Sequence, residues 1–171
     1  MSRAQNGDKD AFTLIYQEYV RPIYRYAYVR VGGHAEQAED LTQEVFLKAL
    51  NSIGRYHYDG KPFGSWLFRI AHNLVIDYYR QVKKGKCIPL TETMTVISDE
   101  DIAATAEQSM GMSEVKQAIE KLPVQQREVM SLRFGAELSV TETAMAMGKT
   151  EGTVKKLQHV ALARLRKLMV R

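Results

Sequence analysis

Cysteine is almost absent from this sequence, and so is any long hydrophobic run. A single cysteine, Cys87, cannot build a disulfide framework, which fits a reducing, cytoplasmic compartment. The first residues lack the apolar core of a signal peptide, and nowhere do about 18 apolar residues follow one another. We therefore expect a cytoplasmic protein without membrane insertion.

The residue patterns of common catalytic sites are also missing. The four histidines are scattered along the chain, at His34, His57, His72 and His159. There is no H-E-x-x-H motif, no cysteine pair and no phosphate-binding glycine loop, since the Gly32-Gly33 pair is better explained as the end of a helix. We expect no enzymatic activity, no metal and no cofactor.

Prolines and glycines are few, four and eleven, and leave long uninterrupted stretches that favour helices. Residues 1–86 carry 13 Lys/Arg against 9 Asp/Glu, residues 87–112 carry none against 5, and residues 113–171 carry 11 against 6. We expect an all-α protein with two small helical domains, 1–86 and 113–171, joined by an acidic linker, 87–112. Two basic blocks suit a polyanion such as nucleic acid, although many solvated helices are also basic.

Helix start and stop signals predict three helices in the first domain and four in the second. The first begins at an Asp8 or Asp10 cap and ends at Gly32-Gly33, and the next two cover 35–52 and 63–84, the last after Pro62. The second domain should hold helices at 113–121, from 123 to about 135, and after the caps Ser139 and Thr150.

The segment that starts at Ser139 has the pattern of a helix-turn-helix. Ser139 and Glu142 form an S-x-x-E capping box, and Gly148 can supply the left-handed residue that ends the short helix. Ala144 is small enough for two helices to cross, and Val154 can plug the second helix into the first. An ordinary helical hairpin is the alternative.

The second helix of this motif separates apolar from basic residues. Its expected buried arc consists of Val154, Leu157, Ala161, Leu165 and Leu168. The opposite side, near the helix N-terminus, carries Gly152, Lys155, Lys156 and His159. This end of a recognition helix enters the major groove, where lysine can donate to guanine or phosphate. Seven Lys/Arg against one Glu after Gly148 favour DNA over a merely solvated face.

A second candidate surface combines aromatic and basic residues in the first domain. Trp66 lies outside the apolar arc of its helix, beside Arg69, Asn73, Asp77 and Arg80. The preceding loop adds Arg55, Tyr56, His57, Tyr58, Lys61 and Phe63. Rings stack on unpaired bases while cations hold phosphates, so this set suits single-stranded nucleic acid. A lone exposed tryptophan more often packs against a neighbouring loop.

The helix at 35–52 has an acidic face. Leu41, Val45 and Ala49 should point inward, whereas another face carries Glu36, Asp40, Gln43, Glu44 and Leu47. Acidic residues repel DNA, so a basic protein surface is the better partner. A merely solvated face is equally consistent with the pattern.

Three motifs in this order resemble one protein family. AEDLTQEVFLKAL, then GKPFGSWLFRIAHNLVIDYYR, then LPVQQREVMSLRF with the helix-turn-helix are similar to the extracytoplasmic-function (ECF) group of bacterial sigma factors. The resemblance covers nearly the whole chain except the linker. It implies an alternative sigma factor that brings core RNA polymerase to promoter DNA, opens it for transcription initiation, and is controlled by an anti-sigma factor.

The resemblance also assigns roles to residues. The first domain would be region 2, which docks on the clamp helices of the polymerase β′ subunit through Asp40, Gln43, Glu44 and Leu47. It would capture bases of the −10 element with Arg55, Tyr56, Tyr58, Lys61, Phe63, Trp66, Arg69, Asn73 and Arg80. The second would be region 4, which contacts the β flap and reads the −35 element with Lys149, Thr150, Gly152, Thr153, Lys155, Lys156 and His159. The linker would run towards the RNA exit channel.

Other functions fit less of the sequence. A transcription regulator that binds DNA without polymerase could share the helix-turn-helix, but such regulators usually carry an α/β receiver or ligand domain, which residues 1–86 do not resemble. A protein-interaction module is a further alternative, favoured if the chain binds a partner but never polymerase.

Overall fold

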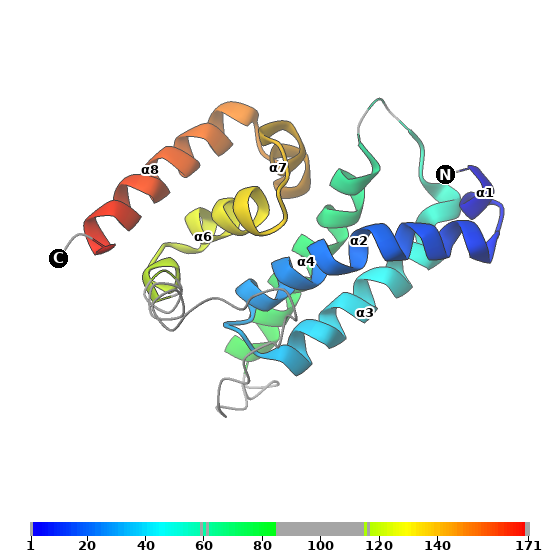
Figure 1. Cartoon of the computed structure of the whole chain (residues 1–171), viewed down its shortest axis with the longest axis horizontal. Helices are drawn as coiled ribbons and strands as arrows, with labels where there is room; N and C mark the ends of the chain where they lie inside the picture. The colour runs from blue at the N-terminus through cyan, green and yellow to red at the C-terminus, as the bar shows by residue number, and fades with distance from the viewer. Residues whose placement is uncertain (1, 59, 61, 85–114, 116, 170–171) are drawn as a thin grey trace, which may run out of the picture.

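The computed structural model describes residues 2–58, 60, 62–84, 115 and 117–169, and this part of the chain contains helices and turns without a strand. Figure 1 shows two groups of helices side by side, α1 to α4 and α6 to α8. The acidic linker and the first residues of the helix expected at 113–121 lie outside the described residues. Residues 115 and 117–120 are helical, as expected.

The first group consists of a four-residue helix α1 (Ser2–Gln5) and three long helices, α2 (Lys9–Arg30), α3 (Ala35–Ser52) and α4 (Phe63–Lys83). A 3₁₀ turn, η1 (Ile53–Arg55), follows α3. The bounds of α2, α3 and α4 confirm the predicted helices to within a residue or two, whereas α1 and η1 were not predicted. Gly32 and Gly33, both at positive φ, separate α2 from α3.

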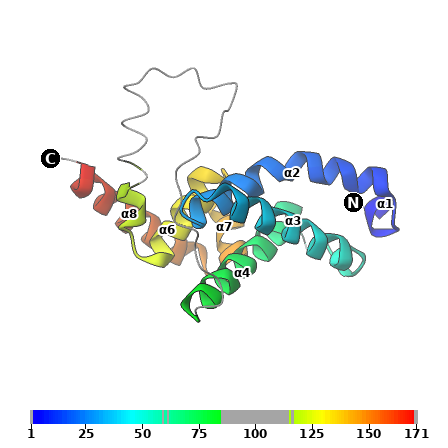
Figure 2. The same cartoon turned by 90° about the horizontal axis from the view of Figure 1, so that it is seen from below.

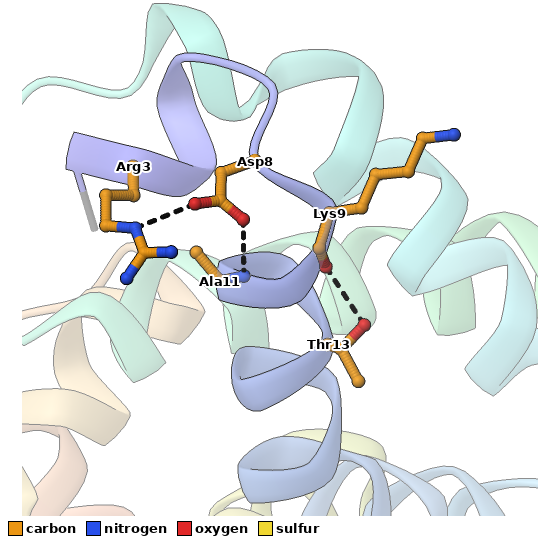
Figure 3. A network of polar contacts seen from close by, with 5 residues as sticks. All are labelled: Arg3, Asp8, Lys9, Ala11 and Thr13. Atoms are coloured by element: carbon orange, nitrogen blue, oxygen red, sulfur yellow. Dashed lines mark hydrogen bonds and ion pairs between the residues drawn. The ribbon is translucent and has the colours of Figure 1, made fainter.

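The start of α2 follows from a side-chain cap (Figure 3). Asp8 accepts a hydrogen bond from the Ala11 amide at 3.0 Å and forms an ion pair with Arg3, whose Nε lies 2.7 Å from the carboxylate. The Ala11 bond, more than the Arg3 contact, lowers the pKa of the Asp8 carboxyl. Thr13 Oγ1 donates to the Lys9 carbonyl one turn later, at 2.9 Å. The cap satisfies an amide that the first turn of the helix leaves without a partner.

The second group contains α6 (Val124–Met130), α7 (Val140–Met147) and α8 (Glu151–Met169). A five-residue π-helical turn, η2 (Ser131–Gly135), continues α6, so the single helix expected to about residue 135 changes its winding. Residues of the 113–121 helix pack through Ala118 on α6 and α8. One expectation is wrong: Leu168, near the end of α8, is 42% exposed instead of buried.

The two groups share one hydrophobic core. Buried residues of α2, α3 and α4 form a single cluster with residues of α6, η2, α7 and α8, including Val129, Leu132 and Val154. Helix α7 packs against α4, and η2 packs against α2. Figure 2 shows the same arrangement from below, with α7 beside α4 and α8 on the far side of α6 from α2. The two expected domains are thus docked on one another.

Candidate nucleic-acid and polymerase interfaces

Helices α7 and α8 form the expected helix-turn-helix. Ser139 Oγ accepts from the Glu142 amide at 3.1 Å and Glu142 Oε2 accepts from the Ser139 amide at 2.8 Å, which completes the capping box. Gly148 ends α7 in the left-handed region, at φ 62°. Ala144 and Val154 are buried where the helices meet, and Val154 is fully enclosed. The side chains predicted to set the crossing are therefore in place.

The outer face of α8 is open to solvent. Gly152, Thr153, Lys155, Lys156 and His159 are all exposed, and a Cβ at Gly152 would meet no atom within 4 Å. Thr150 Oγ1 accepts from the Thr153 amide at 3.3 Å, as expected of a cap. The helix N-terminus adds a partial positive charge beside the two lysines. This end of α8 can approach a phosphate backbone without steric hindrance.

Lys149 differs from the other expected DNA-binding residues of this segment. Its side chain is half-buried and lines a cavity between the turn of the helix-turn-helix and α4. Glu151, beside it, accepts a hydrogen bond from Thr141 Oγ1 at 2.7 Å and lies 3.9 Å from Lys155 Nζ. Lys149 therefore faces the first group of helices rather than the outer face of α8.

Three of the aromatic residues expected to capture bases form one cluster. The Trp66 ring centroid lies 5.1 Å from that of Tyr56 and 5.2 Å from that of Phe63, and the Tyr56 and Phe63 centroids are 5.4 Å apart. Trp66 is half-buried and packs against the small buried cluster of Ala4, Ile15 and Ile53. Gln5 Nε2 donates to the Tyr56 carbonyl at 2.6 Å and holds the loop before α4 in place. We call Tyr56, Phe63 and Trp66 the aromatic cluster.

Cations lie beside the aromatic cluster, as the sequence predicted. Arg55 and Arg69 are exposed and line the same cavity as Tyr56 and Trp66. Tyr58 is 76% exposed at the tip of the loop. The other described members, Asn73 and Arg80, lie farther along α4 and do not line the cavity; Arg80 pairs with Asp77 at 3.0 Å. Lys61 lies outside the described residues.

A tyrosine behind the aromatic cluster was not predicted to be part of this site. The Tyr19 ring of α2 lies 5.9 Å from that of Phe63, edge to face. Burial, followed by the nearby Glu18 carboxylate, raises the pKa of Tyr19 to about 12. A Cβ on Gly64 would come within 3.0 Å of the Tyr19 ring, so the first turn of α4 approaches α2 closely at this point.

The acidic face of α3 is exposed, as expected. Asp40, Gln43, Glu44 and Leu47 all reach solvent, and Glu44 pairs with Lys48 at 3.1 Å. Leu47 is 60% exposed, and Leu50, one turn further along, is 51% exposed and was not predicted as part of the face. An apolar strip bordered by carboxylates suits a protein partner better than DNA.

Family models match two parts of the chain, sigma-70 region 2 over residues 15–85 and sigma-70, region 4 over residues 118–167. The chain is 36% identical over 174 residues to the ECF RNA polymerase sigma factor SigD of Mycobacterium tuberculosis, which covers 97% of this chain and 80% of that protein. The chain belongs to the ECF sigma factors. Helices α2 to α4 are hereafter called region 2, and α6 to α8 region 4.

Other ECF sigma factors are similar over almost all of this chain. The ECF RNA polymerase sigma factor BldN of Streptomyces coelicolor is 42% identical over 175 residues, which are 99% of this chain and 64% of that protein. CnrH, solved in complex with the cytosolic domain of CnrY, shares the fold, with a TM-score of 0.74, 22% identity, and coverage of 98% of this chain and 93% of CnrH.

Another relative was also solved with a partner protein. The sigma factor RpoE of Bartonella quintana, in complex with the anti-sigma factor NepR, has a TM-score of 0.65 and 25% identity, and covers 92% of this chain and 98% of RpoE.

Regions 2 and 4 of this sigma factor meet at a buried polar contact that sequence reasoning missed. Glu128 of α6 accepts a hydrogen bond from the Tyr26 hydroxyl at 3.2 Å and contacts His72 Nδ1 through the same carboxylate oxygen. Burial raises the pKa of Tyr26 well above its usual range, and the Glu128 carboxylate adds to this. In the sequence, Glu128 follows two glutamines and an arginine within α6, so no local pattern marked it as buried. We call Tyr26, His72 and Glu128 the interdomain triad.

The described residues contain no group of three potential metal ligands. Among the same residues, no helix is both long enough and apolar enough to span a membrane.

Proposed function

We propose that this sigma factor binds core RNA polymerase in the cytoplasm and directs it to promoters with two separate DNA-reading surfaces. The observation that supports this most strongly is the pairing of an open recognition face on α8 with an aromatic cluster flanked by arginines on α4. One surface suits duplex DNA and the other suits unpaired bases. A protein that only bound duplex DNA would have no use for the second.

The −35 element is the proposed target of α8. Lys155 and Lys156 can neutralise phosphates or donate to guanine, and Gly152 allows the backbone to approach closely. Thr150, Thr153 and His159 would complete the contact on the same exposed end. Lys149 would reach DNA only after it leaves its half-buried position.

The −10 element is the proposed target of the aromatic cluster. Unstacking a base step costs a few kcal/mol, and stacking a base on an aromatic ring returns about 1–3 kcal/mol. Capture by Trp66 and its neighbours can therefore offset much of the cost of melting without a chemical energy source. The neighbouring Arg55 and Arg69 would hold the phosphates, and no catalytic step is required of this chain.

Core RNA polymerase is the proposed partner of the acidic face of α3, and an anti-sigma factor is the proposed regulator. The exposed carboxylates suit a basic surface such as the β′ clamp helices, and region 4 would contact the β flap. The anti-sigma proposal rests on the relationship to RpoE, which was solved with its anti-sigma factor.

A charge reversal tests the polymerase contact. Asp40→Lys should weaken binding to core RNA polymerase by about tenfold or more, because like charges facing each other cost up to several kcal/mol. Glu120→Lys reverses another exposed glutamate, which lies before α6 and outside the acidic face of α3; it is the matched control and should bind normally. Affinity would be measured by fluorescence anisotropy with purified core polymerase. If Asp40→Lys binds as tightly as Glu120→Lys, the acidic face of α3 is not the polymerase contact. If the wild type does not bind polymerase at all, a polymerase-independent regulator or an interaction module is favoured.

A further inference from the structure

The cavity between α4 and the helix-turn-helix has the size and the lining of a small-molecule site. Its volume is about 480 Å³, within the range of about 300–1,000 Å³ that is usual for such sites. Tyr56 and Trp66 line it from region 2, and Met145 and Lys149 line it from region 4. Rings and a thioether suit a flat apolar group, whereas the lysine suits an anion.

Positive charge dominates this lining. Arg55, Arg69 and Lys149 all border the cavity, and none of them forms an ion pair within the part of the chain that the structure describes. Glu151 is the one carboxylate among the described lining residues, and it already accepts a hydrogen bond from Thr141 Oγ1 at 2.7 Å. Helix α8 begins at Glu151, so its N-terminus adds partial positive charge beside the cavity. The lining therefore favours a ligand with several negative charges.

A buried hydroxyl in the same wall lacks a partner. Ser65 of α4 lines the cavity and is 3% exposed, and its Oγ has no hydrogen-bond partner among the described residues. Buried polar groups are nearly always hydrogen-bonded, because an unpaired one has given up its bonds to water without replacement. A polar ligand in the cavity can supply the bond that the chain itself does not.

Capture of −10 bases accounts for only part of this lining. The surface proposed for the −10 element supplies the rings and both arginines, but Lys149 and Ser65 come from outside that surface. Lys149 is half-buried and faces the cavity instead of the outer face of α8, and Ser65 was not expected in any site. Aromatic rings that stack on a base, together with cations that hold its phosphates, are typical of nucleotide recognition. The complete lining therefore suits a single nucleotide held from both sides.

We propose that this cavity binds a free nucleotide with two or more phosphates, whose base stacks on Trp66 and whose phosphates lie against Arg55, Arg69 and Lys149. Ser65 donates its hydroxyl hydrogen to an oxygen of the same ligand. The bound nucleotide occupies the ring that the −10 bases need, so nucleotide and single-stranded DNA compete. This competition rests on the proposed function, whereas the nucleotide site itself does not. The nucleotide concentration then sets the fraction of this sigma factor that is available to promoters.

The site can be tested in the full chain through intrinsic fluorescence, because Trp66 is the one tryptophan in the sequence. ATP and GTP are the probes, and adenosine and inorganic triphosphate represent the two halves of ATP. ATP or GTP should quench Trp66 saturably, and each half should bind at least about tenfold more weakly than ATP, because it keeps only one of the two kinds of contact. Isothermal titration calorimetry measures the same affinities independently. No saturable binding of ATP or GTP up to millimolar concentration, or binding that leaves Trp66 fluorescence unchanged, overturns the proposal.

Two variants test whether the nucleotide lies in this cavity. Lys149→Ala should weaken ATP binding by about tenfold or more, because a hydrogen bond to a charged group is worth at least that factor. Ser65→Ala should weaken it by about two- to tenfold, yet the free protein should keep or raise its melting temperature, because no hydrogen bond between described residues is lost. Lys167→Ala removes an exposed lysine near the other end of α8 and is the matched control. Unchanged affinity in both cavity variants, or an equal loss in Lys149→Ala and Lys167→Ala, overturns the proposal.

A second ligand separates a free nucleotide from the nucleotides of a DNA strand. A labelled single-stranded oligonucleotide with the −10 sequence offers the same base and phosphate chemistry, and its binding is followed by fluorescence anisotropy. Saturating ATP should displace it, and Lys149→Ala and Ser65→Ala should weaken ATP more than the oligonucleotide. If they weaken both ligands equally, the cavity serves DNA and the nucleotide site is wrong. If the oligonucleotide does not bind at all, the proposed base capture fails, while the ATP titrations still decide whether the cavity is a nucleotide site.

Discussion

Replacing Trp66 by alanine should impair promoter opening far more than binding to duplex DNA. A base stacked on an aromatic side chain contributes about 1–3 kcal/mol. Since about 1.4 kcal/mol corresponds to a factor of ten in an equilibrium constant, open complexes should become roughly 5- to 150-fold less stable. In the proposed function the closed complex depends on α8 and the acidic face of α3, whereas Trp66 belongs to α4.

The substitution also removes packing, and this part must be separated from the loss of base stacking. The rings of Tyr56 and Phe63, with centroids 5.1 and 5.2 Å from that of Trp66, lose their contacts. Full truncation of a core tryptophan costs about 3–5 kcal/mol, so the half-buried Trp66 should cost about 2–4 kcal/mol of folding stability. Trp66→Phe keeps a ring for stacking and should recover most of the opening.

The assay uses 2-aminopurine at a −10 position, whose fluorescence rises when the base unstacks. Closed complexes would be measured at low temperature by gel mobility shift with the same polymerase. Thermal unfolding of each variant would show that the protein is folded at the assay temperature. An equal loss of closed and open complexes, or no loss of either, would refute base capture by Trp66.

Two further predictions concern region 4. Lys155→Ala combined with Lys156→Ala should weaken −35 binding and reduce the slope of log affinity against log salt by up to about 2, because each phosphate contact contributes about 0.9; an unchanged slope would mean that these lysines do not contact phosphate. Ser139→Ala should lower the free energy of unfolding by about 1 kcal/mol, since it removes the cap of α7, whereas Ser139→Asp keeps an acceptor oxygen and should retain the stability in denaturant titrations.

Local signals predicted the helices well because capping acts within a few residues. Asp8 and Ser139 each start a helix through a side-chain hydrogen bond, and Gly148 ends one because, without a Cβ, it readily adopts a positive φ. The bounds of α3 and the helix-turn-helix followed from such signals together with helical periodicity. The sequence therefore predicted both the all-α class and the segments that carry the candidate sites.

The helical periodicity of the sequence did not predict the π-helical turn after α6 or the exposure of Leu168 near the end of α8. The π-helical turn at Ser131–Gly135 packs against α2, and no pattern within the segment predicted its winding. Leu168 continues the apolar arc of α8, yet it is 42% exposed. A helical wheel specifies which residues share a face, but burial requires a partner for that face.

The sequence indicated the residues of the aromatic cluster but not those of the interdomain triad. Tyr56, Phe63 and Trp66 lie within eleven residues of one another, so a loop and one helical turn bring them together. Glu128 and His72 are 56 positions apart, and Glu128 and Tyr26 are 102 apart. Their contact depends on the docking of two domains, which no pattern within either domain specifies.

The most direct test of the central claim is transcription in vitro with purified core RNA polymerase on fragmented genomic DNA of the host, with and without this chain. Transcript 5′ ends would be mapped in both reactions. If the chain is a sigma factor, some starts will depend on it and will share two upstream elements at a fixed spacing. Starts that are identical in both reactions, together with no binding to core polymerase, would contradict the account.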